Sequence, residues 1–383
     1  MKKFKQLNSR TFFSKCISYA AAGALLAGCL AGCASGNGQT ASGARSGSDI
    51  NVPSVDASQK EADAGLQIVT TIFPEYDWVR EILGENPGNA EVTMLLDNGV
   101  DLHSYQPTAQ DILKISTCDL FVYVGGESDE WVEDALEEAT NKDMIVINLL
   151  EELGESVKEE EIVEGMEHDH DHEHSEVEHE DDHDEDREGK HDEDHDHEHE
   201  EGEVEYDEHV WLSLKNASVL CDSIKDALTE LDAANAAVYE ANAESYKKQL
   251  AALDADYQAA VKSAAVKTVL FGDRFPFRYM TDDYGLSYYA AFAGCSAETE
   301  ASFETIIFLA NKVDELGLPT ILKIESGDGK IAETIKNNTK TKDQKILTMD
   351  SMQSTTSKDV AAGKTYAGIM AENLQVLREA LNQ

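Results

Sequence analysis

Short apolar segments alternate with amphipathic helical patterns along residues 66–150. Each apolar segment has four to eight residues and is bounded by turn residues, which is typical of a buried strand. Strands are predicted at Leu66–Phe73, Glu91–Leu96, Leu120–Val124 and Met144–Leu149, and helices at Tyr76–Leu83, Thr108–Ile115 and Glu130–Ala139. Pro74 is expected to end the first strand. The alternation predicts βαβ units around a parallel sheet.

The same alternation returns in residues 265–383. Strands are predicted at Thr268–Phe271, Ser287–Phe292, Thr320–Ile324 and Lys345–Met349, and helices at Phe277–Asp283, Ser302–Leu316, Lys330–Asn337 and Thr365–Leu381. The fold class is therefore α/β. It consists of two lobes of β/α units, with residues 206–230, which contain a helix at Asn216–Leu228, completing the first lobe.

A longer helical pattern over residues 231–264 connects the two lobes. Its apolar positions recur at spacings of three, four and seven residues, which forms one stripe along the helix. The stripe consists of Tyr239, Tyr246, Leu250, Leu253, Tyr257 and Val261. About 30 helical residues span on the order of 45 Å, which is longer than one small lobe needs. We expect a linking helix with a cleft between the lobes.

An acidic, histidine-rich tract interrupts the first lobe. Glu151–Glu208 holds 31 acidic and three basic residues, about −28 of the chain's −45. Ten of the twelve histidines lie there: His168, His170, His172, His174, His179, His183, His191, His195, His197 and His199. Residues 151–205 contain too few apolar side chains for a core and are predicted to be a disordered insert. Clustered imidazoles and carboxylates attract metal ions, so auxiliary metal capture is expected, and a solvated acidic spacer is the alternative.

The N-terminus has the pattern of a secretory signal. A basic start precedes an apolar run that is too short for a confident membrane span. Two consecutive Leu-Ala-Gly-Cys sequences end at Cys29 and Cys33, and they resemble bacterial lipoprotein signals. We expect a signal peptide over residues 1–28, lipid attachment at Cys29 with Cys33 as the alternative, and a flexible tether over residues 29–65. The lipid would anchor the protein to the cell membrane on its extracytoplasmic face. An ordinary secretory signal is the alternative.

The three remaining cysteines and the net charge exclude some classes of site and partner. Cys118, Cys221 and Cys295 are odd in number and widely spaced, which does not fit a disulfide framework or a C-x-x-C metal site. They are expected to be mostly buried small apolar residues. Strong negative charge argues against nucleic acid as a partner.

Two histidines lie outside the tract and mark a candidate metal site. His103 follows a predicted strand, which is the position where open α/β sheets place ligands. His209 lies where the chain returns from the insert. Because the second lobe has no histidine, further ligands from it would have to be carboxylates. The acids at its strand ends are Asp273, Glu325 and Asp350.

Four stretches resemble a known family. They are DLHSYQPTAQD (101–111), DEHVWLS (207–213), YGLSYYAAFAGCSAETEAS (284–302) and LTMDSM (347–352). These stretches are similar to the zinc and manganese solute-binding lipoproteins of ABC uptake transporters, the ZnuA/TroA-like group, from about Leu66 to the C-terminus without the insert. The resemblance implies two lobes joined by a rigid long helix, with metal in the cleft.

The resemblance also implies a ligand set. His103 matches the histidine of the family's H-x-Y-x-P-T segment, His209 that of its D-x-H-x-W segment, and Asp350 the late-strand acid. The family's third ligand would fall within FGDRFP (271–276), where an ungapped count places Arg274, which cannot bind metal. Asp273 is the nearest ligand, and an insert histidine or water is the alternative. Glu325 is expected to support the ligands from behind.

The expected function is capture of Zn²⁺ and delivery to an ABC permease and its ATPase by a monomeric lipoprotein. Two imidazoles with two carboxylates would also suit Mn²⁺, but the histidine tract favours zinc. The alternatives are a manganese-binding member of the family and a surface metal buffer or cell-adhesion protein without a transport role. His179 and His183 fit the H-E-x-x-H protease pattern, yet surrounding like charges would destabilise the helix that this motif requires, so no enzyme is expected.

Overall fold

Two parallel sheets form the framework of the protein. The structure is a computed structural model that describes residues 65–85, 89–166, 205–296 and 300–381. Within these residues the strands form two four-stranded sheets, ordered β2-β1-β3-β4 and β6-β5-β7-β8. The strands are β1 (Gln67–Thr70), β2 (Glu91–Met94), β3 (Leu120–Tyr123), β4 (Ile145–Asn148), β5 (Thr268–Arg274), β6 (Ser287–Phe292), β7 (Thr320–Ile324) and β8 (Lys345–Met349). Every pairing between them is parallel, which confirms the predicted α/β class.

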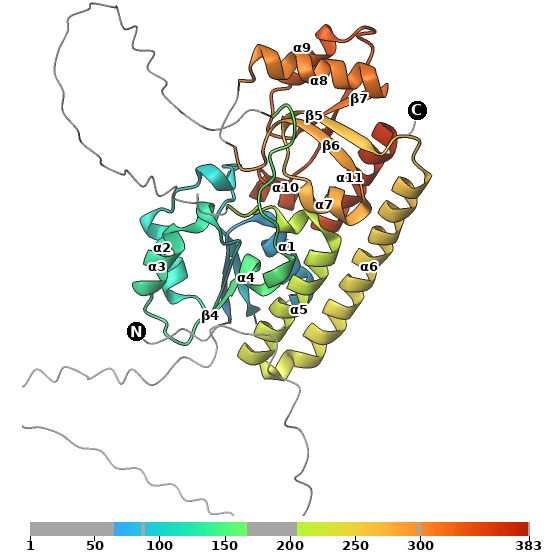
Figure 1. Ribbon diagram of the computed structural model, residues 1–383. Coiled ribbons are helices and arrows are strands. Elements are labelled where there is room, and N and C mark those ends of the chain that lie inside the picture. The colour runs from blue at the N-terminus through green and yellow to red at the C-terminus, as the bar shows by residue number, and fades with distance from the viewer. Residues whose placement is uncertain (1–64, 86–88, 167–204, 297–299, 382–383) are drawn as a thin grey trace, which may run out of the picture. The chain divides into compact units, whose positions relative to one another are not determined.

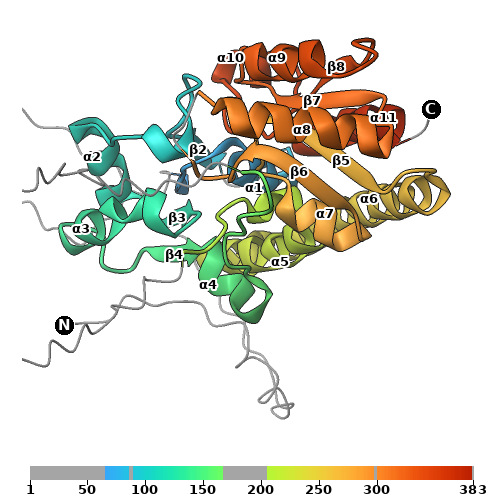
Figure 2. The same ribbon diagram turned by 45° about the horizontal axis from the view of Figure 1, so that its top comes forward.

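Helices pack against both sheets (Figure 1). The α-helices of the first lobe are α1 (Phe73–Leu83), α2 (Ala109–Thr117), α3 (Trp131–Glu137), α4 (Leu149–Leu153) and α5 (Leu214–Leu231). Those of the second lobe are α7 (Arg278–Tyr284), α8 (Phe303–Leu316), α9 (Lys330–Asn338), α10 (Ser357–Ala361) and α11 (Tyr366–Leu381). In the second lobe α8 and α9 contact each other, whereas α11 packs on β5, β7 and β8 (Figure 2).

The long helix α6 (Ala236–Ser263) contacts both lobes. Its 28 residues span about 42 Å. It packs on α1 and α5 of the first lobe and on α7 and α11 of the second, and Figure 1 shows it running alongside both. Of the predicted stripe, Leu253 is partly exposed and the other five side chains are buried. At the second lobe, the Tyr257 hydroxyl donates a hydrogen bond of 2.6 Å to the Met370 carbonyl.

The first helix begins earlier than the sequence suggests. Helix α1 starts at Phe73 and holds Pro74 in its first turn, where a missing N–H costs no intrahelical hydrogen bond. The buried Glu75 carboxylate accepts hydrogen bonds from the Thr71 and Ile72 backbone N–H groups at 2.8 and 3.2 Å. Pro74 therefore opens a helix instead of simply ending a strand. Helix α10 was not predicted because five residues are too few to show a helical period.

The beginning of the predicted disordered insert is folded. Residues 151–153 belong to α4, and the chain remains described to Met166, which is buried. Glu159 forms an antiparallel bridge with Tyr206, and the Tyr279 hydroxyl accepts a hydrogen bond from the Lys158 N–H at 3.0 Å. Long-range contacts thus order residues 151–166, contrary to the prediction. The ten tract histidines, Cys29, Cys33, the signal peptide and the tether up to Ala64 lie outside the described residues.

No helix within the described ranges is both long and apolar enough to cross a lipid bilayer.

Candidate metal centre

His103 is fixed by the turn that follows β2. It lies in a 3₁₀ helix, Leu102–Ser104, which the buried Leu102 anchors. Asp101 caps this turn, because its Oδ1 accepts a hydrogen bond from the His103 N–H at 3.1 Å. On the imidazole, Nδ1 lies 2.7 Å from Ser128 Oγ and 3.4 Å from Glu208 Oε2. The ring is therefore held through Nδ1, and Nε2 is directed elsewhere.

His209 is held in the same manner and is fully buried. Asp207 Oδ1 accepts a hydrogen bond from the His209 N–H at 2.9 Å and lies 3.0 Å from Nδ1. A carboxylate oxygen can only accept, so Nδ1 carries the proton and Nε2 presents its lone pair. The segment after His209 is tied to the second lobe, because Trp211 Nε1 donates a hydrogen bond of 2.9 Å to the Ser351 carbonyl.

The two imidazoles direct their Nε2 atoms toward each other. His103 Nε2 and His209 Nε2 are 3.3 Å apart. Two nitrogens bound to one tetrahedral zinc, each at 2.0–2.1 Å, would be separated by about 3.3 Å. Oxygen partners on the opposite ring nitrogens are the usual support of metal-binding histidines. The pair therefore has the separation and the orientation of two ligands of one metal ion.

The environment keeps His103 neutral. Burial and the neighbouring His209 lower the pKa of His103 to about 3, against smaller raising effects of the nearby carboxylates Asp101 and Asp207. Neutral imidazole is the form that binds metal.

Cys295 joins the two histidines and was missed as a ligand candidate. Its Sγ and one ring nitrogen of each of His103 and His209 all lie within 4.8 Å of one another. It follows strand β6 by three residues, and the strand-end reasoning applied to His103 would have found it. It was instead expected to be a buried apolar residue, which holds for Cys118 and Cys221. Burial and the nearby acids Asp207, Glu160 and Glu208 raise the pKa of the Cys295 thiol, so it is protonated without metal.

The structure does not bring the predicted acids to the histidines. Among the described residues, the group of close ligand atoms contains neither Asp273 nor Asp350. Asp273 accepts hydrogen bonds from the Arg274 and Ile324 N–H groups at 2.9 and 3.2 Å. Asp350 accepts one from the Met352 N–H at 2.8 Å. Both carboxylates are occupied in fixing loops of the second lobe.

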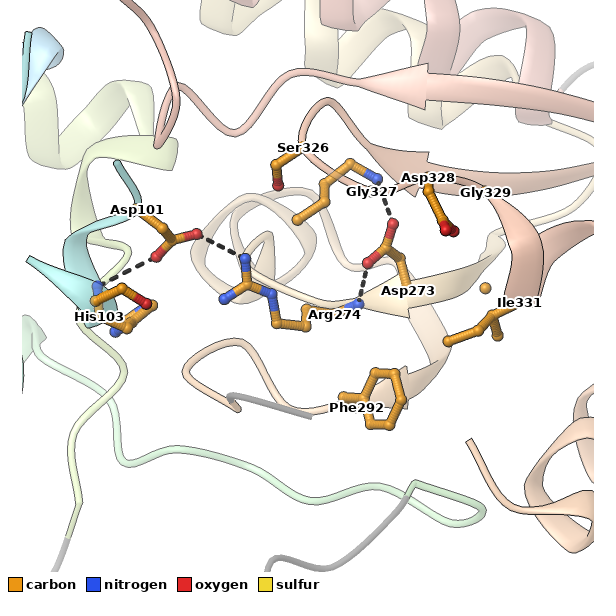
Figure 3. Close-up of a pocket in the computed structure, with 13 residues that line it drawn as sticks. Asp101, His103, Asp273, Arg274, Phe292, Ser326, Gly327, Asp328, Gly329 and Ile331 are labelled. Carbon is orange, nitrogen blue, oxygen red and sulfur yellow. Dashed lines mark hydrogen bonds and ion pairs between the residues drawn. The ribbon is translucent and has the colours of Figure 1, made fainter. Parts of the chain in front are cut away.

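Arg274 crosses from the second lobe to the first. Its guanidinium donates a hydrogen bond of 2.6 Å to Asp101 Oδ2, and Figure 3 shows the side chain extending away from Asp273 toward the carboxylate beside His103. These residues line a cavity of about 420 Å³. The position where the resemblance implies a third ligand is thus filled by a cation that is paired across the lobes.

Gln353 lies against His209 from the loop after β8. Its side-chain Nε2 contacts His209 Nε2, and its Oε1 is buried without a hydrogen-bond partner. Glu325 supports this loop, as its carboxylate accepts hydrogen bonds from Ser351 N–H and Oγ at 2.7 and 2.9 Å. Burial and the adjacent Asp350 raise the pKa of Glu325. Glu325 therefore fixes the loop that carries Gln353, through Ser351 and through Ser354 Oγ at 3.3 Å.

Comparison with known proteins identifies the family. A family model described as the periplasmic zinc-uptake complex component A, ZnuA, matches residues 68–380. The chain belongs to the ZnuA family. The predicted family and two-lobe fold are thereby confirmed, and the ZnuA family is one of transport components and not of enzymes.

Named relatives agree with the ZnuA assignment. The zinc-binding protein AdcA of Streptococcus pyogenes serotype M6 is 30% identical over 326 residues, 84% of this chain and 57% of AdcA. The high-affinity zinc uptake system protein ZnuA of Bacillus subtilis is 27% identical over 316 residues, 82% of this chain and 88% of that protein. The chain therefore spans little more than half the length of the AdcA relative.

A solved structure of the ZnuA type has the same fold. The Zn(II)-bound ZnuA-like domain of Streptococcus pneumoniae AdcA superposes with a TM-score of 0.60 at 25% identity, covering 84% of this chain and 100% of that domain.

Proposed function

We propose that this chain binds Zn²⁺ between its two lobes and delivers it to an ABC permease powered by an ATPase. The observation that carries the proposal is the His103–His209 pair, with Nε2 atoms 3.3 Å apart and both Nδ1 atoms held by oxygen. Membership in the ZnuA family and relatives named as zinc-binding support the delivery step.

Zinc is favoured over manganese by the donor atoms. Imidazole nitrogen suits Zn²⁺, whereas Mn²⁺ prefers carboxylate and water oxygen. The carboxylates Asp273 and Asp350, which would have made the site harder, are engaged with backbone N–H groups.

The histidine-rich insert would serve as a collecting segment next to the site. Glu160 and Glu205, which precede and follow the histidines of the tract, are joined by a hydrogen bond of 2.9 Å between the Glu160 N–H and the Glu205 carbonyl. Both line a cavity of about 250 Å³ together with His103 and Glu208. Metal held on the tract would therefore be released beside His103, through an opening whose acidic side chains attract cations.

A competition titration against a zinc chelator tests the binding site. The full chain is compared with a His103→Ala/His209→Ala variant and with a chain in which residues 167–204 are replaced by a Gly/Ser linker. We expect one tight equivalent of zinc to persist in the linker variant and to disappear in the double variant. Tight binding that survives the double variant and is lost with the insert would refute the proposal.

Delivery and anchoring have their own readouts. Deletion of the gene should impair growth under zinc limitation, and the double histidine variant should not restore it; normal growth of the deletion strain would argue for a metal buffer. We propose lipid attachment at Cys29, with Cys33 as the alternative. Cys29→Ala should then release the protein from the membrane fraction, and release by Cys33→Ala alone would assign the anchor to Cys33.

A further inference from the structure

The two histidines leave half of a tetrahedral zinc site unfilled. Zinc in proteins is held by four ligands from imidazole nitrogen, thiolate sulfur, carboxylate oxygen or water. The stretch where the resemblance implies a third ligand supplies Arg274, which is paired with Asp101. Asp273 and Asp350 are bound to backbone N–H groups. Among the described residues, neither acid belongs to the group of close ligand atoms around the two histidines, which points to another element or to solvent for the third ligand.

Cys295 occupies a suitable position. Its Sγ lies within 4.8 Å of ring nitrogens of His103 and His209. In a tetrahedral site with Zn–S of 2.3 Å and Zn–N of about 2.05 Å, sulfur and nitrogen would be about 3.6 Å apart. The remaining difference is on the order of 1 Å, which a small side-chain rotation supplies. The backbone is already anchored, because the Cys295 N–H donates a hydrogen bond of 3.0 Å to Glu160 Oε1.

A second observation marks the same point as a ligand position. Gln353 is 3% exposed, its amide lies against His209 Nε2, and its Oε1 has no hydrogen-bond partner. Buried polar atoms are nearly always paired, so the unpaired Oε1 shows that this orientation of the amide leaves one of its polar atoms unsatisfied. A half-turn of the amide exchanges its oxygen and nitrogen, which brings the oxygen to face the His209 nitrogen.

We propose that Cys295 coordinates zinc as a thiolate, as the third ligand beside His103 and His209, with Gln353 Oε1 in the fourth position. The inference rests on the proposed function and adds the ligand that the acids of the second lobe do not supply. On binding, the thiol releases its proton to solvent and its sulfur donates an electron pair to the metal. A sulfur ligand selects zinc and other thiophilic ions against manganese and so accounts for selectivity within the cleft itself.

Cobalt substitution tests the sulfur ligand directly. Co²⁺ is added to the full chain, and the sulfur-to-cobalt charge-transfer absorption in the near ultraviolet is measured. The insert contains no cysteine, so its histidines cannot produce this band. The matched control for Cys295→Ser is Cys221→Ala, which removes a free buried thiol elsewhere in the fold.

The expected result is a band that Cys221→Ala retains and that both Cys295→Ser and His103→Ala abolish. Zinc affinity of Cys295→Ser should fall by more than about 100-fold, since loss of an outer-shell partner alone costs 10- to 100-fold. Cobalt binding that depends on His103 and His209 but gives no band would overturn the thiolate and leave the proposed function intact. Cobalt binding that is unchanged when both histidines are replaced would overturn the proposed function as well.

Alkylation of the unmodified sequence provides a second measurement that needs no folded Cys295 variant. Cys295 is partly exposed, and it lines the cavity of about 250 Å³ beside His103. One equivalent of zinc should slow iodoacetamide labelling of the Cys295 peptide at least several-fold in mass spectrometry. Labelling at an unchanged rate in the zinc-loaded protein would contradict coordination by this thiol.

Discussion

Replacement of Asp207 tests whether the orientation of His209 determines zinc affinity. Asp207 is 2% exposed, and one of its carboxylate oxygens accepts from the His209 N–H and lies 3.0 Å from Nδ1. In Asp207→Ala the imidazole loses this acceptor, so the proton is free to move to Nε2 and block the metal. Partners of this kind are worth 10- to 100-fold in metal affinity, or about 1.4–2.7 kcal/mol.

A graded series separates charge from geometry. Asp207→Asn keeps an oxygen that accepts both hydrogen bonds and loses only the charge, so it should weaken zinc binding by about tenfold, and Asp207→Ala by up to about 100-fold. Ser128→Ala on the other imidazole should cost less, because Glu208 Oε2 also lies 3.4 Å from His103 Nδ1. The assay is a chelator competition on proteins whose metal-free thermal unfolding shows that they are folded. Wild-type affinity in Asp207→Ala would refute the orienting role.

Three further changes probe the surroundings of the site. Asp273→Asn and Asp350→Asn should each change zinc affinity by less than about tenfold, the lower limit for an outer-shell partner; a loss of 100-fold in the same titration would make that acid a ligand. Arg274→Met removes the ion pair to Asp101, which is more than four-fifths buried, and should destabilise the metal-free protein by about 1.5–3 kcal/mol, read as a lower urea midpoint; an unchanged midpoint would show that the pair does not hold the lobes together. Burial raises the pKa of Asp77 to about 6. The protonated carboxyl therefore contributes about 3 kcal/mol of folding stability, which is fully present below about pH 3.8 and is lost as the pH rises through 6. In urea titrations from pH 4 to 8, Asp77→Asn should lack this loss of stability, and a profile parallel to the wild type would contradict the assignment.

Local pattern was sufficient for most of the framework. Strand and helix periods located all the strands of both sheets, and the position after β2 singled out His103. The early start of α1 was not predicted, because a proline without an N–H is as suited to the first turn of a helix as to the end of a strand. The folded segment at 151–166 was not predicted for another reason. Lys158 is hydrogen-bonded to Tyr279, 121 positions away, and local composition gives no sign of such long-range contacts.

The sequence predicted only part of the ligand set, because the same residue type can either bind metal or stabilise the backbone. An aspartate at a strand end is as suited to accepting backbone N–H groups as to binding metal, and both Asp273 and Asp350 do the former. Cys295 lies in an apolar glycine-containing stretch, and its place just after β6 is what distinguishes it from an ordinary small side chain. Gln353 is uncharged, so its sequence position gave no reason to consider it a ligand. Their roles depend on three-dimensional convergence at His209.

The most direct test of the central claim is anomalous diffraction at the zinc edge from crystals of the zinc-loaded chain. We expect one strong peak about 2.0–2.1 Å from both His103 Nε2 and His209 Nε2. A dominant zinc peak that lies away from this pair would contradict the assignment of the metal centre.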